Sequence, residues 1–366
     1  MINIQFVLSL VAFVSLLADW STAQDRNART SIAERFKRLD RNGDGKLTQE
    51  EIPRLFKQLD ANNDGQVTLN EANAFYASGR RTGAGSGQGQ QTPSVPMKVV
   101  RDIPYAKIED AAPNLTSIDI YAPEKAADCP VMIWVHGGAW QKGDKGNIRG
   151  LSDAFVREGF VLVSTNYRLA PKDKFPAQPE DVAAAIAWVY KHATEYGGDP
   201  GRLFLMGHSA GAHLVALLAT DESYLQKNGL TLKALSAVVP LDTEAYNLEG
   251  LAERFGGKLP DTWGVPFGQD PVAWAKASPI AHVKKGKGIP PMIVAYSGGM
   301  KPNSNPNRAK DAEEFVKALT EAGVTAEIIG APEKTHAQIA SEFGQPGDHV
   351  AEKIFAFIRK IQGNKP

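Results

Sequence analysis

A serine flanked by glycines is the feature of this sequence best suited to chemistry. Residues 202–211 read Arg-Leu-Phe-Leu-Met-Gly-His-Ser-Ala-Gly, so that an apolar run enters a Gly-x-Ser-x-Gly motif and an Ala-rich helical pattern leaves it. A serine hydroxyl is a weak nucleophile unless the backbone presents it to a base and to oxyanion donors. A sharp strand-to-helix turn does this, and the flanking glycines leave room for the strained backbone. Ser209 is therefore the predicted nucleophile.

A second glycine-containing loop supplies candidate donors for an oxyanion. The apolar run 131–135 ends in His136-Gly137-Gly138, where backbone N–H groups can point into a site because side chains are absent. The N–H of Ala210, directly after the serine, is the third candidate. Gly137, Gly138 and Ala210 are predicted to stabilise the oxyanion formed when an ester carbonyl is attacked.

The predicted base is His336, which follows the last apolar run and precedes the C-terminal helical pattern. From there it can accept the Ser209 proton and later protonate the leaving group. Four other histidines are less suitable: a surface role is expected for His282 and His349, and a packing role for His208 and His213.

The elements that must position these residues begin at Met97, from where apolar runs alternate with amphipathic helical patterns. Strands separated by helices predict a mostly parallel sheet covered on both faces, which is an α/β fold. Expected strands are 98–104, 117–122, 130–136, 160–166, 202–207, 234–240, 291–296 and 325–330, and the main expected helices are 179–196, 210–219, 308–322 and 348–361.

Residues 97–366 resemble the α/β-hydrolase fold, because nucleophile, acid and histidine follow in that order. The stretches 166–171 (NYRLAP), 178–182 (QPEDV) and 277–280 (ASPI) are similar to carboxylesterases of the hormone-sensitive-lipase type, and still more to the feruloyl and acetyl-xylan esterase branch. The resemblance implies no cofactor for catalysis. It assigns the nucleophile to Ser209, the base to His336 and the oxyanion hole to Gly137, Gly138 and Ala210.

The acid departs from the family pattern. Related enzymes carry an aspartate soon after the penultimate strand, but residues 297–307 contain no carboxylate. The other sheet position that supplies an acid follows the preceding strand, which favours Asp242. Asp311, Glu244 and the absence of any acid are the alternatives; without an acid the imidazole would be poorly oriented and catalysis slow.

A repeat with a period of twenty residues precedes this region and carries oxygen side chains at metal-ligand spacing. Gly45 and Gly65 occupy the sharp turn of each loop, and Leu47 and Val67 are expected to pack the two loops together. A glutamate at the twelfth position can bind with both oxygens, as Ca²⁺ prefers. The predicted ligands are Asp40, Asn42, Asp44, Lys46 (by its carbonyl), Thr48 and Glu51 in the first loop, and Asp60, Asn62, Asp64, Gln66 (by its carbonyl), Thr68 and Glu71 in the second.

Both loops resemble the EF-hand family, with a departure in their spacing. The loops lie closer together than in a standard pair, so one short helix through residues 52–59 is expected to serve both. This compact layout is similar to dockerin-type calcium repeats. The resemblance implies structural Ca²⁺ and a docking role toward a protein partner.

Charge and the N-terminal segment restrict the possible partners and the location of the protein. The formal net charge is zero and Lys and Arg form no long run, which argues against a nucleic-acid partner. The apolar run 6–18, followed by Ser-Thr-Ala at 21–23, predicts a signal peptide and a secreted or periplasmic protein, with membrane attachment only if the signal stays uncleaved.

Cys129 is the sole cysteine, so no internal disulfide is expected. The predicted order is signal 1–23, EF-hand pair 31–77, flexible linker 78–96 and hydrolase domain 97–366.

Together these features predict a secreted serine carboxylic-ester hydrolase that works through an acyl-enzyme. The segment 242–289 is modest and mixes polar with aromatic residues, which argues against a large lipase lid. The resemblance implies small esters or esterified polysaccharides, acetyl or feruloyl, as substrates. The alternatives are an arylformamidase or peptidase on the same fold, and a non-catalytic calcium-dependent binding protein.

Overall fold

The chain forms two units, residues 1–90 and 91–366. The computed structural model describes residues 32–52, 56–60, 65–69, 71–72, 95–148, 150–301 and 306–363. The predicted signal peptide and residues 78–94 of the predicted linker lie outside the described residues, as do Asn62 and Asp64 of the second calcium loop.

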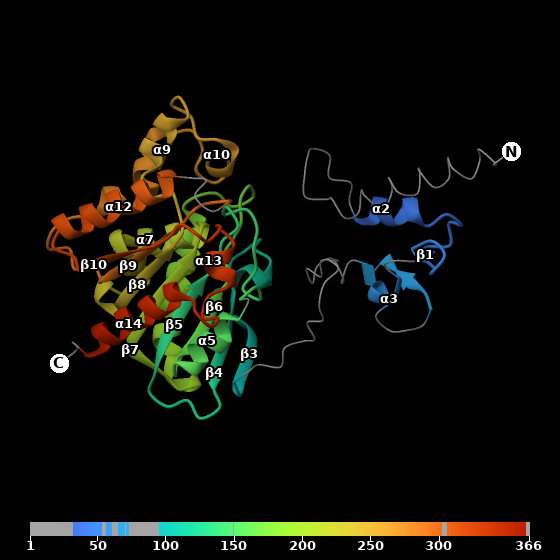
Figure 1. Ribbon diagram of the computed structural model, residues 1–366, viewed down its shortest axis with the longest axis horizontal. Coiled ribbons are helices and arrows are strands. Elements are labelled where there is room, and N and C mark those ends of the chain that lie inside the picture. Colours follow the sequence, from blue (N-terminus) through green and yellow to red (C-terminus); the bar gives the residue numbers. More distant parts are fainter. Residues whose placement is uncertain are drawn as a thin grey trace. The chain divides into compact units, whose positions relative to one another are not determined.

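The first unit is built around a short two-stranded sheet (Figure 1). Its elements are α2 (Ile32–Leu39), β1 (Lys46–Leu47), α3 (Phe56–Leu59) and β2 (Val67–Thr68). Strands β1 and β2 pair antiparallel, with Leu47 opposite Val67. Both side chains are fully buried, as expected for the residues that join the loops, and they pack with Phe36, Ile52, Phe56, Leu59 and Ala72.

The second unit is organised by an eight-stranded sheet of order β10-β9-β8-β7-β5-β6-β4-β3. Strand β4 pairs antiparallel with β3 and β6, and the other neighbours are parallel. Each predicted strand is present. The bounds are β3 (Met97–Pro104), β4 (Ser117–Pro123), β5 (Cys129–Val135), β6 (Val161–Thr165), β7 (Gly198–His208), β8 (Leu235–Leu241), β9 (Met292–Ser297) and β10 (Ala326–Ala331).

Side-chain alternation along the central strands creates two cores, one on each face of the sheet. In β5, Val131, Ile133 and Val135 belong to one core, whereas Met132 and Trp134 belong to the other. Because both faces are covered, these strands are apolar at nearly every position rather than at every second one.

Helices cover both faces (Figure 1). Helices α6 (Ala177–His192), α7 (Ala210–Thr220) and α12 (Pro306–Glu321) contribute to the first core, and α5 (Leu151–Arg157) and α14 (His349–Gly363) to the second. The remaining helices are α8 (Ser223–Gln226), α9 (Leu248–Arg254), α10 (Asp261–Phe267), α11 (Pro271–Ala277), α13 (Gln338–Ser341) and the 3₁₀ turns 113–116, 193–196, 232–234 and 279–282.

This architecture is the predicted α/β-hydrolase fold. The parallel strands end at one edge of the sheet, and residues that follow different strands are brought together there. Within the part of the chain that the structure describes, no helix combines the length and apolarity needed to cross a membrane.

Candidate active site

The turn after β7 holds Ser209 in a strained conformation. Its φ of 57° and ψ of −117° lie outside the regions that L-residues favour. The glycines on either side are required by close backbone contacts. A Cβ on Gly207 would lie 2.4 Å from the Gly211 carbonyl oxygen, and one on Gly211 would lie 2.0 Å from the Val135 oxygen. The backbone where β7, α7 and β5 meet therefore leaves no room for a side chain at positions 207 and 211, and the motif requires glycine there.

The glycines after β5 lie directly against the serine turn. A Cβ on Gly137 would be 2.8 Å from the His208 carbonyl oxygen and 3.0 Å from the Ser209 Cβ. Gly138 has a φ of 127°, and a Cβ there would lie 1.9 Å from the Lys142 oxygen. The structure thus brings the predicted oxyanion loop beside the predicted nucleophile.

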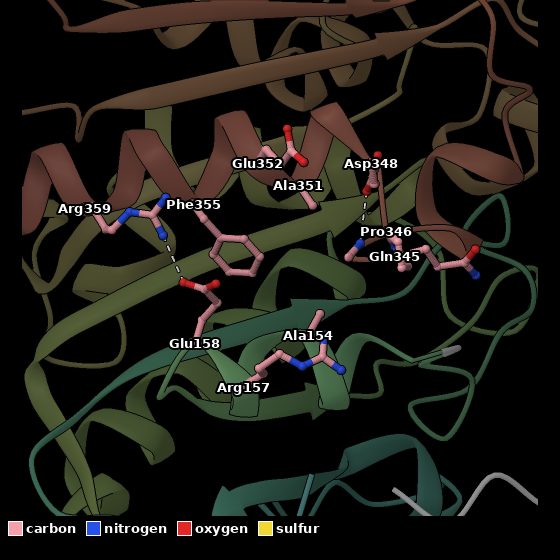
Figure 2. Close-up of a pocket in the computed structure, with 12 residues that line it drawn as sticks. Ala154, Arg157, Glu158, Gln345, Pro346, Asp348, Ala351, Glu352, Phe355 and Arg359 are labelled. Atoms are coloured by element: carbon pink, nitrogen blue, oxygen red, sulfur yellow. Dashed lines mark hydrogen bonds and ion pairs between the residues drawn. The ribbon is translucent and has the colours of Figure 1, made fainter. Parts of the chain in front are cut away.

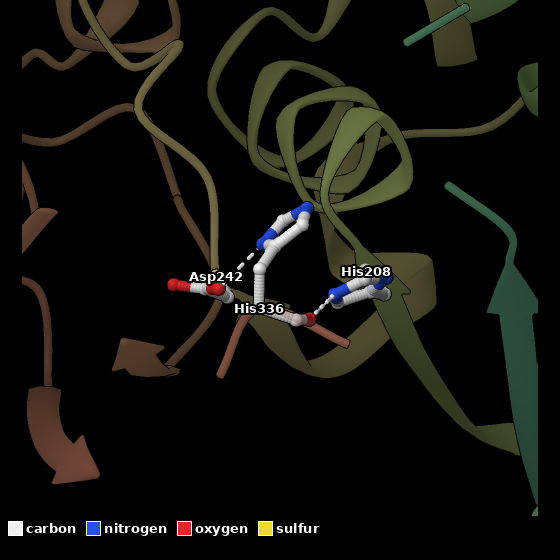
Figure 3. Close-up of side chains that lie close together, drawn as sticks. All are labelled: His208, Asp242 and His336. Atoms are coloured by element: carbon white, nitrogen blue, oxygen red, sulfur yellow. Dashed lines mark hydrogen bonds and ion pairs between the residues drawn. The ribbon is translucent and has the colours of Figure 1, made fainter. Parts of the chain in front are cut away.

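Ser209, His336 and Asp242 form a continuous hydrogen-bonded chain. His336 Nε2 lies 2.9 Å from Ser209 Oγ, and His336 Nδ1 lies 2.6 Å from Asp242 Oδ2. His336 sits in the loop after β10, and Asp242 directly follows β8 with a left-handed φ of 64°. Figure 3 shows the Asp242 carboxylate pointing at the imidazole.

The backbone of His336 is held on both sides. Its N–H donates to the Gly299 oxygen, and its carbonyl oxygen lies 2.7 Å from His208 Nε2 (Figure 3). Because a carbonyl can only accept, His208 Nε2 must carry a proton. Burial lowers the pKa of His208 to about 3, so its ring is neutral near pH 7. His208 is therefore a neutral donor that fixes the loop carrying His336.

Asp242 is fully buried and has further partners besides the imidazole. Ser297 donates its N–H to Oδ1 at 2.9 Å and its hydroxyl to Oδ2 at 2.6 Å, and Arg308 Nη1 lies 3.0 Å from Oδ2. Burial opposes ionisation of this carboxyl, but the hydrogen bond from His336 and the Arg308 charge hold its pKa well below the usual range. The site therefore contains a carboxylate that is ionised at any working pH.

The rival acids contact arginines rather than the imidazole. Asp311 pairs with Arg254 at 2.8 Å, and Glu244 pairs with Arg308 at 2.9 Å. The other candidate histidines also have partners outside the triad. The ring nitrogens of His213 contact the Trp140 indole N–H at 3.3 Å and the Ala277 oxygen at 2.7 Å. His282 Nε2 contacts the Lys276 oxygen, and His349 faces Glu333.

Two residues of this site were not predicted, Ser297 and Arg308. The sequence pattern places them at the end of a strand and in an amphipathic helix, where serine and arginine are unremarkable. The one signal was the lack of a carboxylate after β9, which implied that something else must occupy that part of the site.

His208, Asp242 and His336 offer atoms within 4.8 Å of one another, a spacing that could hold a metal ion. Both imidazole nitrogens of His336 already have hydrogen-bond partners, and His208 Nε2 faces a carbonyl. The cluster is consequently arranged for proton transfer rather than for metal binding.

The described part of the first unit has the donor chemistry of a calcium loop. Asp40 accepts the Gly43 and Gly45 N–H groups, each at 2.8 Å, and both glycines are left-handed, so the loop folds back on this carboxylate. Glu51 is buried, which raises its pKa, but backbone hydrogen bonds from Thr48 and Arg41 prevail and lower it. Ionised oxygen ligands suit a hard cation such as Ca²⁺.

In the second unit, a cavity of about 240 Å³ lies between α5 and α14. Figure 2 shows Phe355 extending from α14 among the lining residues, with the Arg359–Glu158 ion pair, 2.9 Å long, at one side. None of its lining residues belongs to the chain of Ser209, His336 and Asp242.

Comparisons with known proteins agree with the fold. Esterase LipQ of Mycobacterium tuberculosis is 33% identical over 280 residues, which cover 72% of this chain and 63% of LipQ, so the chain spans less than two thirds of that relative. Kynurenine formamidase of Danio rerio is 27% identical over 266 residues, 72% of this chain and 83% of that protein. A truncated carbohydrate esterase from gut microbiota has the same fold, with a TM-score of 0.58 at 21% identity over 76% of this chain and 100% of that one.

Two family patterns match the two units. The EF-hand pattern matches residues 32–55 and 52–75, which cover the paired loops. The BD-FAE pattern matches residues 118–300, half of the chain, from β4 to the loop after β9. Given the extent of this match, the protein belongs to the BD-FAE family of α/β-hydrolase domains, with an EF-hand pair on its N-terminal side.

Proposed function

We propose that this protein is a serine-dependent carboxylic-ester hydrolase. The observation that carries the proposal is the chain from Ser209 Oγ through His336 to Asp242, with contacts of 2.9 and 2.6 Å, at a strained turn packed against a glycine loop. Membership of the BD-FAE family and the esterase names among the relatives support it.

In the proposed reaction, Ser209 Oγ bonds to the ester carbonyl carbon while its proton passes to His336 Nε2. The carbonyl electron pair moves onto oxygen, where the N–H groups of Gly137, Gly138 and Ala210 would stabilise it. Cleavage of the ester C–O bond releases the alcohol, which takes the proton from His336. Water then repeats the sequence on the acyl-enzyme and releases the acid.

Asp242 has an electrostatic role in this scheme. Its carboxylate accepts the Nδ1–H of His336, which fixes the tautomer with Nε2 free to take the serine proton, and it stabilises the imidazolium that forms. Because Asp242 is fully buried, its whole effect passes through the imidazole rather than through substrate.

For substrates, we propose small or carbohydrate-linked esters with acetyl or feruloyl acyl groups. The name of the carbohydrate esterase that shares the fold supports this class. A second candidate is hydrolysis of N-formyl arylamines, since kynurenine formamidase is among the relatives. Comparing the two classes of substrate at equal concentration distinguishes them.

For the first unit, we propose structural Ca²⁺ bound by the predicted oxygen ligands of each loop. The match of both loops to the EF-hand family and the folding of the first loop around Asp40 support this assignment.

We further propose that the protein is exported, on the strength of the apolar segment 6–18. N-terminal sequencing of protein recovered from the producing cell tests export, with Gln24 expected as the first residue.

Labelling with a fluorophosphonate tests the serine mechanism. The wild-type protein should form a covalent adduct at Ser209, located by peptide mass spectrometry, and should hydrolyse an aryl acetate. Ser209→Ala should lose both. Ser152→Ala, which changes a serine of α5 outside the hydrogen-bonded chain, serves as the control for nonspecific labelling, because the adduct should remain on Ser209. No adduct on correctly folded wild-type protein would refute the proposal.

A further inference from the structure

A buried guanidinium from α12 lies between two carboxylates that follow β8. Arg308 Nη1 is 3.0 Å from Asp242 Oδ2, and Arg308 Nη2 is 2.9 Å from Glu244 Oε1. The three side chains are 10%, 0% and 13% exposed respectively, so water screens these charges poorly. A planar fork can contact two carboxylates in this way, whereas a lysine ammonium cannot hold the same geometry.

The same guanidinium touches the base. Arg308 Nη1 lies 3.0 Å from His336 Nδ1, and both nitrogens converge on Asp242 Oδ2. Nδ1 needs its proton to donate to Asp242, so Arg308 and His336 meet as two donors that share one acceptor. A fixed cation at this distance disfavours a second positive charge on the imidazole. Glu244, on the far side of the guanidinium, partly offsets that effect.

We propose that Arg308 and Glu244 are positioning residues that set, through opposite charges, how readily His336 becomes protonated. Arg308 opposes the imidazolium and Glu244 favours it. Arg308 also holds the Asp242 carboxylate in place through its contact with Oδ2, and Glu244 holds the guanidinium. This inference rests on the proposed function, because it assumes that His336 acts as the base for Ser209.

The other titratable groups around His336 keep a constant charge near neutral pH, so that the ionised Asp242 is a fixed background to the two opposing charges. His208 is neutral at its pKa of about 3, and burial raises the pKa of Tyr246, beside Asp242, well above 10, so neither changes charge near neutral pH. On the histidine's own loop, Lys334 is paired with Glu342 and Asp348, each at 3.1 Å. Among the residues that the structure describes, His336 thus contacts His208 from β7, Asp242 after β8 and Arg308 from α12, and Glu244 lies behind the guanidinium.

The test measures two rates from pH 4 to 9: the rate of fluorophosphonate labelling at Ser209 and the rate of aryl acetate hydrolysis. Arg308→Met should move the acid limb of both profiles to higher pH by about one unit, because the imidazolium loses a neighbouring like charge. Glu244→Gln should move it to lower pH. Arg308→Lys should keep the wild-type limb at a reduced maximum rate. Lys310→Met, which removes an exposed cation from the same helix, should match the wild type.

Opposite shifts in Arg308→Met and Glu244→Gln support the inference, since a purely structural role would lower both rates without moving either profile. Shifts in the same direction, or none, overturn it. If Arg308→Met fails to fold by circular dichroism, Glu244→Gln and Arg308→Lys decide: an unmoved Glu244→Gln profile overturns the inference. Labelling without ester hydrolysis would refute the proposed function alone, and no labelling of the wild type would refute both.

Discussion

Replacing Asp242 by asparagine removes one charge from the site and almost no volume. The lost charge lies 2.6 Å from His336 Nδ1 in a fully buried position. At an effective dielectric constant of 20, unit charges about 4 Å apart interact by about 4 kcal/mol. An amide can also turn its NH₂ toward the imidazole and favour the wrong tautomer, a change that costs about 10⁴-fold in a serine triad. We therefore expect kcat to fall by about 10³–10⁴-fold, equivalent to ~4–5.5 kcal/mol.

The assay is steady-state hydrolysis of a soluble aryl acetate. Since Asp242 has no exposed surface, KM should stay within about twofold and the loss should lie in kcat. Asp311→Asn is the matched control, because this alternative acid is paired with Arg254 rather than with His336. It should destabilise the fold by breaking that pair while kcat stays within about threefold of the wild type.

Two results would refute this assignment of the acid. One is a folded Asp242→Asn variant whose kcat lies within tenfold of the wild type, which would mean that the imidazole is oriented without a carboxylate. The other is an Asp311→Asn loss as large as that of Asp242→Asn. Thermal melting of both variants separates loss of fold from loss of chemistry.

Three further predictions concern other parts of the chain. Gly211→Ala should lower the free energy of unfolding by about 3 kcal/mol or more in urea titrations, because its Cβ would lie 2.0 Å from the Val135 oxygen. Burial lowers the pKa of His213 to about 4, so the unfolded state binds its proton more tightly, and this residue alone should account for ~3 kcal/mol of the stability that the wild type loses between pH 6.5 and 4. His213→Phe should lose about 3 kcal/mol less than the wild type over this range, and an equal loss in that variant would contradict the reasoning. Glu51→Gln should weaken Ca²⁺ binding at least tenfold by calorimetry, whereas Glu50→Gln, one residue outside the ligand pattern, should not.

The fold could be predicted largely because both faces of the sheet are buried. Continuous apolar runs mark such strands, and the eight expected strands agree with the observed bounds within one or two residues except at β7. That strand begins at Gly198 instead of the predicted 202, since Gly198 pairs with Cys129 across an irregularity in the register. The intervening Gly-Asp-Pro-Gly is typical of a turn, and local pattern alone could not show that it continues the sheet.

The site was predictable where local backbone geometry determines the residue. Ser209 and the oxyanion glycines stand out because the turns need them, and His336 because it follows the last strand. Arg308 was not predictable: its position in a charged amphipathic helix has no local signature, and its importance arises only because α12 brings it to Asp242. Side chains that act across long sequence separations carry little signal in a single sequence.

The position of the acid follows from the geometry of the sheet edge. Strands β8 and β9 are parallel neighbours, with Leu241 opposite Ala295, and the Asp242 N–H donates to the Ala295 oxygen at 2.8 Å. A carboxylate after either strand therefore emerges close to the same imidazole. In this chain the end of β9 supplies Ser297, which donates two hydrogen bonds to the carboxylate that β8 supplies. The imidazole therefore has a buried anionic partner although the position after β9, where the resemblance implied an aspartate, carries no carboxylate.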